Sequence, residues 1–145
     1  MNPKIIDGIL YGADDVVARW VQKHCSGEAK IDVPAVALGV TKGKTLAGGI
    51  IFYSQRGNDI QCAVACVDVT AWLPRVVATC MRYPFVQLGL DRVTAEIELK
   101  NTRSARLAEG LGFVREGVKR RAASDGGHVA VYGLLRKDFR FKGHL

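Results

Sequence analysis

The residue types best suited to metal binding or nucleophilic chemistry are few in this sequence. Its 145 residues include three histidines and four cysteines, which are Cys25, Cys62, Cys66 and Cys80. Cys62 and Cys66 lie four residues apart in an apolar, strand-like stretch, with no further Cys or His at the spacing of a zinc site. We therefore expect no metal site and interpret the cysteines as buried free thiols. We expect His128 at the surface and His24 and His144 to be peripheral.

Charged residues offer two other kinds of chemistry. Glu96 and Glu98 are two residues apart on an expected strand, so they share one face, and solvent on that face would make them ordinary surface charges. The formal net charge is +7, and a basic surface attracts nucleic acid, acidic protein or a phosphorylated cofactor. Charge alone does not separate these partners from a solvated basic face. The late basic residues are Lys119, Arg120, Arg121, Arg136, Lys137, Arg140 and Lys142.

The length and composition fit one globular domain over residues 1–145. The chain is 48% hydrophobic and 24% charged, which argues against disorder. It has no apolar run of about 18 residues and no signal peptide, so we expect a cytoplasmic protein that does not cross a membrane.

Apolar periodicity and turn residues predict the elements that position these groups. The expected order is β, α, three β, α, β, α, β, β, which makes a mixed α/β sheet. A helix between the third meander strand and the next strand predicts that these two strands are parallel neighbours. The expected strands are Lys4–Leu10, Ala35–Val40, Thr45–Ser54, Ile60–Val69, Asp91–Leu99, Val114–Arg121 and Val129–Leu135. The first expected helix runs from Asp14 or Asp15 to Gly27 and is followed by a polar connection over Glu28–Pro34. The second runs from Pro74 to an end or kink near Arg82–Tyr83, because Pro84 interrupts its pattern. The third runs from the N-cap Asn101 to about Gly110.

Three segments then follow in a familiar order: Leu90–Ile97, Asn101-Thr102-Arg103-Ser104, and Leu111-Gly112-Phe113-Val114-Arg115-Glu116-Gly117. The set resembles the GNAT superfamily of N-acetyltransferases, in which a strand precedes N-x-x-S/A, a short helix, L-G-F and E-G. The ending Tyr132–Phe139 is similar to the branch that acetylates ribosomal-protein N-termini, and Tyr83–Gly89 is similar to small bacteriophage proteins. The resemblance implies a single-domain GNAT fold: a mixed, mostly antiparallel twisted sheet with splayed central strands and helices on both faces.

The resemblance also implies acetyl-CoA as co-substrate. In GNAT folds the pantetheine arm lies between the splayed strands and pairs with the first of them, here at Val67-Asp68-Val69. The pyrophosphate lies at the start of the next helix, here Trp72-Leu73-Pro74-Arg75-Val76, where free N–H groups favour an anion. Arg75 could contact a phosphate or be an exposed helix residue. The family usually has glycines in this loop, whereas this chain has none between Gly57 and Gly89.

Site residues follow from the same resemblance. Asn101 is expected to contact the cofactor as well as cap its helix, and Ser104 to face the cofactor one turn later or to satisfy a local backbone group. The general base is expected among Asp68 and Glu98, with Glu96 behind them. Many GNAT enzymes place a Tyr acid seven residues after the Asn, where this chain has Ala108. The predicted catalytic residues are therefore Asp68, Glu98 and Ser104.

Three classes of function remain open at this point. The first is acetyl transfer to a primary amine on a protein N-terminus, a lysine or a small molecule, where Lys119–Arg121 would guide an acidic acceptor. The second is a catalytically degenerate GNAT domain that acts as a binding module. The third is a nucleic-acid-directed protein, tested by salt-dependent retention on DNA. The apolar segment Val129–Leu135 would allow a homodimer.

Overall fold

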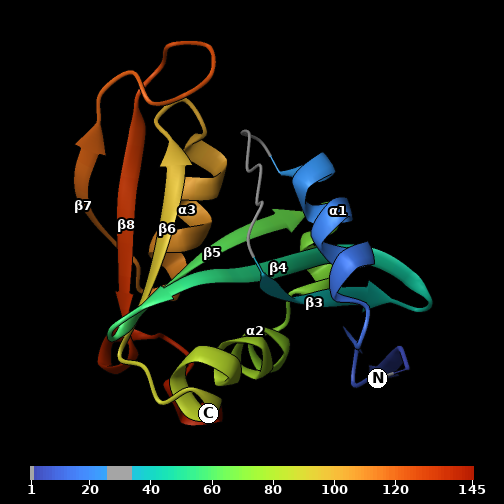
Figure 1. Ribbon diagram of the computed structural model, residues 1–145. Helices are drawn as coiled ribbons and strands as arrows, with labels where there is room; N and C mark the ends of the chain where they lie inside the picture. The colour runs from blue at the N-terminus through green and yellow to red at the C-terminus, as the bar shows by residue number, and fades with distance from the viewer. Residues whose placement is uncertain (1, 26–33) are drawn as a thin grey trace.

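The computed structural model describes residues 2–25 and 34–145. In this part of the chain eight strands form one sheet, in the order β1-β2-β3-β4-β5-β6-β8-β7 (Figure 1). Every neighbouring pair is antiparallel except β5 and β6, which are parallel, so the expected mixed sheet is confirmed. The strands are β1 (Lys4–Ile6), β2 (Ile9–Tyr11), β3 (Ala35–Lys42), β4 (Thr45–Arg56), β5 (Asp59–Cys66), β6 (Arg92–Glu98), β7 (Val114–Lys119) and β8 (Val129–Leu135).

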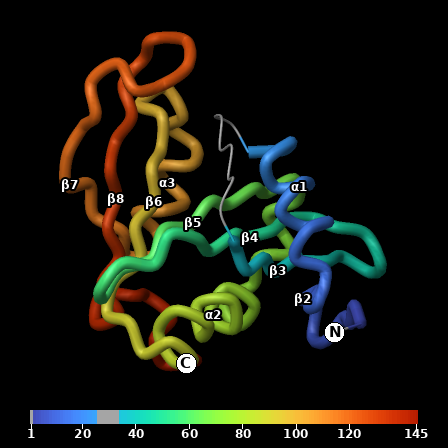
Figure 2. Tube along the Cα trace, viewed as in Figure 1, coloured from blue at the N-terminus to red at the C-terminus, as the bar shows by residue number. Residues whose placement is uncertain are grey.

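Helices cover both faces of this sheet. On one face α1 (Asp14–His24) buries Val17 and Val21 against Ile51 of β4 and Ala65 of β5. On the other face α2 (Pro74–Arg82) and α3 (Thr102–Leu111) pack over a larger core that includes Phe52 and the C-terminal segment, which returns beside α2 (Figures 1 and 2). None of the described helices is long and apolar enough to cross a bilayer.

The N-terminal segment differs from the single strand expected over Lys4–Leu10. It is a hairpin, β1 and β2, with its two-residue turn at Asp7 and Gly8. Both turn residues have positive φ, +50° and +81°. Asp-Gly is the sequence that such a turn favours, because both of its central positions need this conformation. The turn signal is in the sequence, but each strand is too short to show an alternating pattern.

The meander strands follow the expected turns but end differently. The first two strands, β3 and β4, run on to Lys42 and Arg56, and β5 ends at Cys66, three residues before the expected end at Val69. Beyond Cys66 the chain forms a 3-10 turn over Val69–Ala71. The N–H groups of Val67 and Asp68 both donate to the carbonyl of Ala47, at 2.8 and 3.1 Å, which turns the chain out of the regular ladder.

The connection from β5 to β6 confirms the predicted crossover. Pro74 occupies the first turn of α2, which ends at Arg82, and a π-helical turn with Pro84 follows over Tyr83–Gln87. The next helix, α3, is capped as expected, because the Asn101 Oδ1 accepts a hydrogen bond from the Ser104 N–H at 3.1 Å. Gly112 ends α3 with φ +109°, and a Cβ there would collide with the Asp138 carbonyl.

Two further expectations concern chain segments rather than single residues. The predicted helix end at Gly27 and the connection from Glu28 onward lie outside the described residues, except for Pro34. The segment Val129–Leu135 forms β8, which is bonded to β6 on one side and β7 on the other. It is therefore an interior strand with neighbours on both edges, and the homodimer stays a prediction.

A tryptophan connects the loop before α2 to the sheet. The Trp72 indole lies directly over Gly48 of β4, so that a Cβ on Gly48 would come within 2.7 Å of its Cε2 and Cζ2 atoms. Gly48 is therefore the residue that lets this loop pack closely on the strand.

We expect Gly48→Ala to lower the free energy of unfolding by about 1–3 kcal/mol, because the rigid indole must move. Chemical denaturation measures this change. Gly117→Ala in β7 is the matched control, since a Cβ there meets nothing within 4 Å. Equal stability of both variants would contradict the proposed packing of Trp72.

Candidate active site

The candidate site begins where β5 and β6 stop pairing. The two strands share four rungs, from Asp59–Arg92 to Cys62–Ala95. Beyond these, β5 stays bonded to β4 and β6 stays bonded to β8, so the sheet opens into a gap (Figure 1). The predicted splay of the central strands is thus confirmed.

Beyond its last shared rung, the edge of β5 that faces β6 has no neighbouring strand among the described residues. The Val67 N–H is directed to β4, since it donates to the Ala47 carbonyl. Hydrogen bonding alternates along an antiparallel strand, so the backbone groups of Val64 and Cys66 face the opposite way, into the gap. An extended ligand with amide groups could bond to this edge.

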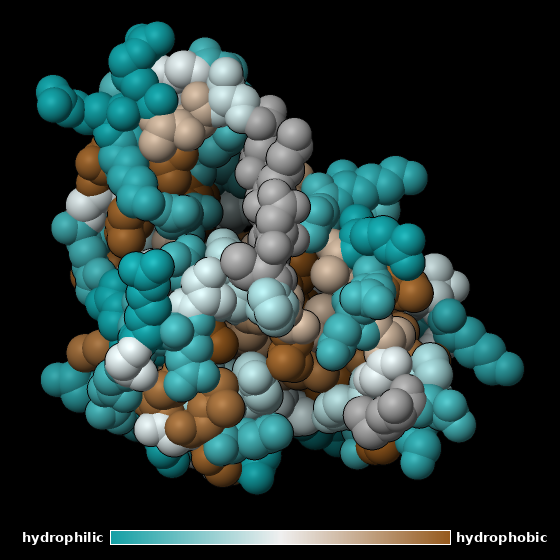
Figure 3. Space-filling model, in the orientation of Figure 1, coloured by the Kyte–Doolittle hydropathy of each residue, from teal (hydrophilic) through white to brown (hydrophobic). Residues whose placement is uncertain are grey.

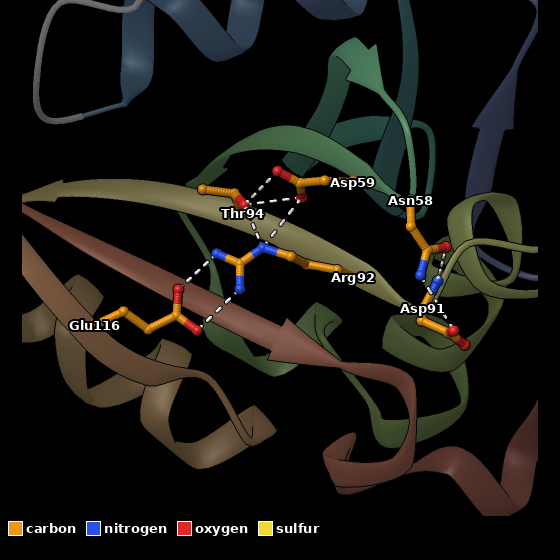
Figure 4. Close-up of polar contacts among 6 residues, drawn as sticks. All are labelled: Asn58, Asp59, Asp91, Arg92, Thr94 and Glu116. Carbon is orange, nitrogen blue, oxygen red and sulfur yellow. Dashed lines mark hydrogen bonds and ion pairs between the residues drawn. The ribbon is translucent and has the colours of Figure 1, made fainter.

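A polar network joins β5 and β6 in their paired section, before the gap opens (Figure 4). The Arg92 guanidinium of β6 donates to both carboxylate oxygens of Glu116, at 2.9 and 2.6 Å, and its Nε lies 3.5 Å from Asp59 of β5. The Thr94 hydroxyl lies 2.8 and 2.9 Å from the two Asp59 oxygens. The bidentate pair crosses β8 at Gly133, where a Cβ would come within 2.6 Å of the Arg92 Nη1. The network therefore links β5, β6 and β7 within the section where β5 and β6 are paired.

A cavity of about 650 Å³ occupies the gap. Figure 3 shows the molecular surface in the orientation of Figure 1, with hydrophobic and hydrophilic side chains interspersed. The walls of the cavity come from β5, β6, α2, α3, the C-terminal end of α1 and the loop after β7. The walls on the α2 and α3 side are largely apolar, whereas carboxylates lie on the other side. Residues that represent these walls are Val64, Met81, Leu107, Glu96, Lys119 and Ser124.

Side chains of β6 alternate between the two sides of the cavity. Ala95 and Ile97 pack toward the α2 and α3 core, so Glu96 and Glu98 point to the opposite face. Glu96 forms an ion pair with Lys119 of β7, and its side chain is 31% exposed. Glu98 lies 3.7 Å from Lys100, and its side chain is 16% exposed. Both carboxylates line the cavity, but Glu96 directly follows the last shared rung.

The other predicted site residues divide into two groups. Val69, Trp72, Asn101 and Ser104 line the cavity beside these carboxylates. The remaining residues are not among its lining and lie around the start of α2, where Leu73 provides no side-chain cap and the first helical bond is made by the Val77 N–H. These are Val67, Asp68, Leu73, Pro74, Arg75 and Val76.

Asp68, one of the predicted catalytic residues, is held by contacts of its own at the turn after β5. Its carboxylate accepts hydrogen bonds from the Thr70 N–H and hydroxyl, at 3.0 and 2.6 Å, and from the Lys42 ammonium at 2.9 Å. The Thr70 hydroxyl first, and then Lys42, lower the pKa of Asp68 to about 2. A carboxylate with so low a pKa is a weak base, and Asp68 lies outside the cavity lining.

Several lining residues were not predicted from the sequence. His24, expected to be peripheral, stacks on Trp20 with ring centroids 4.2 Å apart and lines the cavity near Cys25. Arg103 lines it from the first turn of α3. No local pattern marks these two residues, because they come from α1 and α3, which are far apart in the sequence.

All four cysteines line the same cavity. Burial raises the pKa of Cys62 and of Cys80 to about 12, so these two thiols are inert at neutral pH. Burial also raises the pKa of Cys66, although the Arg103 charge opposes this shift. Within residues 2–25 and 34–145, no three His, Cys, Asp or Glu side chains gather as a metal site would require.

Comparison with known proteins finds similar folds among solved acetyltransferase structures. No protein-family profile matches the chain, and no curated protein does. Among solved structures, a proposed acetyltransferase from T. thermophilus is similar, with 27% identity and a TM-score of 0.63 over 75% of this chain. The match spans 63% of that protein's own length.

Two further structures match over more of their length. Mycobacterium smegmatis RimJ, solved in complex with CoA-disulfide, has a TM-score of 0.69 at 12% identity and covers 99% of this chain and 91% of its own. A GNAT-family acetyltransferase from Streptococcus pneumoniae has a TM-score of 0.66 at 14% identity, covering 88% and 98%. The chain therefore has the fold of the GNAT acetyltransferases, as its motifs predict. The predicted likeness to bacteriophage proteins stays a prediction.

The contacts of Asp68 predict how stability depends on pH. Its native pKa is lowered, so its contribution is present above the unfolded carboxyl pKa of about 4 and is lost as pH falls toward 2. We expect Asp68→Asn to lower the melting temperature at pH 7 and to match the wild type near pH 2. Thermal melts across this range measure the difference. A constant difference down to pH 2 would contradict the assignment.

Proposed function

We propose that the protein is an N-acetyltransferase that moves an acetyl group from acetyl-CoA to a primary amine by direct attack in a ternary complex. The observation that carries this proposal is the gap beside β5. It combines a free backbone edge at Val64 and Cys66, an apolar wall, and two carboxylates on the far side within one cavity. The GNAT fold supports the same activity.

The shape of the gap supports one orientation of acetyl-CoA. The gap is narrowest at the rung Cys62–Ala95 and widens toward the start of α2. The nucleotide end is bulky and charged, so it belongs at the wide end, near the free N–H groups of Arg75 and Val76. The pantetheine amides would then bond to the edge of β5, and the thioester would lie near the last rung.

This orientation favours Glu96 as the general base, which changes the order predicted from the sequence. Glu96 directly follows Ala95, the β6 residue of the last rung, whereas Glu98 lies two residues further along β6. In the proposed reaction the amine nitrogen attacks the thioester carbonyl as Glu96 accepts its proton. The carbon–sulfur bond then breaks, and the CoA thiolate takes a proton from solvent or from Ser104, which lines the cavity.

The start of α2 supplies one test of cofactor binding. We expect isothermal titration to give a micromolar dissociation constant for acetyl-CoA. Arg75→Gln should raise this constant about tenfold, which is about 1.4 kcal/mol, because a charge-assisted contact with phosphate is lost. Arg82→Gln, at the opposite end of the same helix, is the control and should leave it unchanged. Absence of binding at millimolar acetyl-CoA would overturn the proposal.

The paired carboxylates supply a test of catalysis. We expect Glu96→Gln to lower kcat about 100-fold at unchanged cofactor affinity, since a positioned base is lost. Glu98→Gln, on the same face of the same strand, should have a much smaller effect. Release of free CoA thiol, measured with a panel of small amines and peptides, follows the reaction. A larger loss of kcat in Glu98→Gln than in Glu96→Gln would indicate that Glu98 is the general base.

A second candidate is a module that binds acetyl-CoA without turning it over. The absence of glycine between Gly57 and Gly89 and the presence of Ala108 at the family's usual Tyr position favour it. Tight binding without thiol release from any amine would support this second function over the first.

A further inference from the structure

An amine of the chain itself already lies in the candidate acceptor position. Lys119 ends β7 opposite Val129 of β8, and Glu96 pairs with Val131 of the same strand, so both side chains stand on one face. The Lys119 ammonium contacts the Glu96 carboxylate, and both residues line the cavity. A salt bridge of this kind shows that the face accepts a primary ammonium group.

Lys119 differs in this respect from the other lysines that the structure describes. It is the one among them that lines the cavity. Lys100, which is not among the lining residues, also contacts carboxylates: its ammonium lies 2.5 Å from Asp125 and 3.7 Å from Glu98. The two side chains are similarly exposed, 56% for Lys119 and 66% for Lys100, so access to solvent does not separate them.

The geometry points to self-acetylation: we propose that the chain transfers an acetyl group from bound acetyl-CoA to its own Lys119. This inference rests on the proposed function. The Lys119 Nζ gives a proton to Glu96 and attacks the thioester carbonyl. A carbon–nitrogen bond forms, the carbon–sulfur bond breaks, and the thiolate leaves as CoA after taking up a proton. The product is a neutral amide, so the positive charge beside Glu96 is removed.

Lys119 is well placed for this step for two reasons. Its partner Glu96 is also the carboxylate nearest the last shared rung, where the thioester is expected. Its position at the end of an edge strand leaves a long, half-exposed side chain that can leave the carboxylate without disturbing the core. Because the amine and the bound thioester would be held in one molecule, their reaction would be faster than the same reaction between two molecules.

The test is to incubate the full chain with acetyl-CoA and to quantify acetylation of Lys119 and Lys100 by peptide mass spectrometry. We expect Lys119 to react about 100-fold faster than Lys100, the scale of a positioned base. The rate constant should not depend on protein concentration. Glu96→Gln should slow the acetylation of Lys119 without affecting that of Lys100. In protein unfolded in urea, the two lysines should be acetylated at similar rates.

The outcomes separate this inference from the proposed function. If acetyl-CoA binds by titration but Lys119 reacts no faster than Lys100, self-acetylation is overturned while the proposed function stands. A rate constant that rises in proportion to protein concentration would also overturn it, because the reaction would then occur between molecules. Failure of acetyl-CoA to bind at all would overturn both. Unchanged thermal unfolding and unchanged acetyl-CoA affinity of Lys119→Arg would check that this variant is folded.

Discussion

The parallel pairing of β5 and β6 ends after four rungs, and the arrangement of the site depends on this limit. Each strand is bonded along its remaining length to its other neighbour, β4 or β8, so in the described part of the chain the strand pairing between the two halves of the sheet is limited to these four rungs. The contact is reinforced on one side by Arg92, which contacts Asp59 of β5 and Glu116 of β7. The cavity, the free edge of β5 and the carboxylate face all begin where this contact ends.

The polar face of β6, β7 and β8 contains two ion pairs with different surroundings. Arg92 and Glu116 are linked by two hydrogen bonds above Gly133, in a network that also includes Asp59 and Thr94. Lys119 and Glu96 are linked by one ammonium group, which has freedom to rotate and to leave. The same face therefore carries a fixed pair that sets geometry and a looser pair inside the cavity.

Local signals in the sequence predicted much of the fold. Asn101 caps α3, Gly112 ends it, and Pro74 begins α2, because each of these residues acts on its own few neighbours. The end of β5 was predicted wrongly because Val67 and Val69 continue its apolar pattern, whereas the contacts that stop the strand come from Ala47 of β4. The ion pair of Asp68 was not predicted for the same reason, since its partner Lys42 is distant in the chain. The cavity residues His24 and Arg103 come from different helices, so their proximity depends on how the elements pack and cannot be read from spacing in the sequence.

The register shift in β7 also bears on how the molecule behaves at high concentration. β7 is the edge of the sheet, and every one of its residues is exposed. An exposed edge invites addition of a strand from another molecule, but the irregularity between Arg115 and Gly117 breaks the row of hydrogen-bonding groups that such a strand would follow. The residues that place Glu116 over Gly133 thus also protect the sheet against aggregation along this edge.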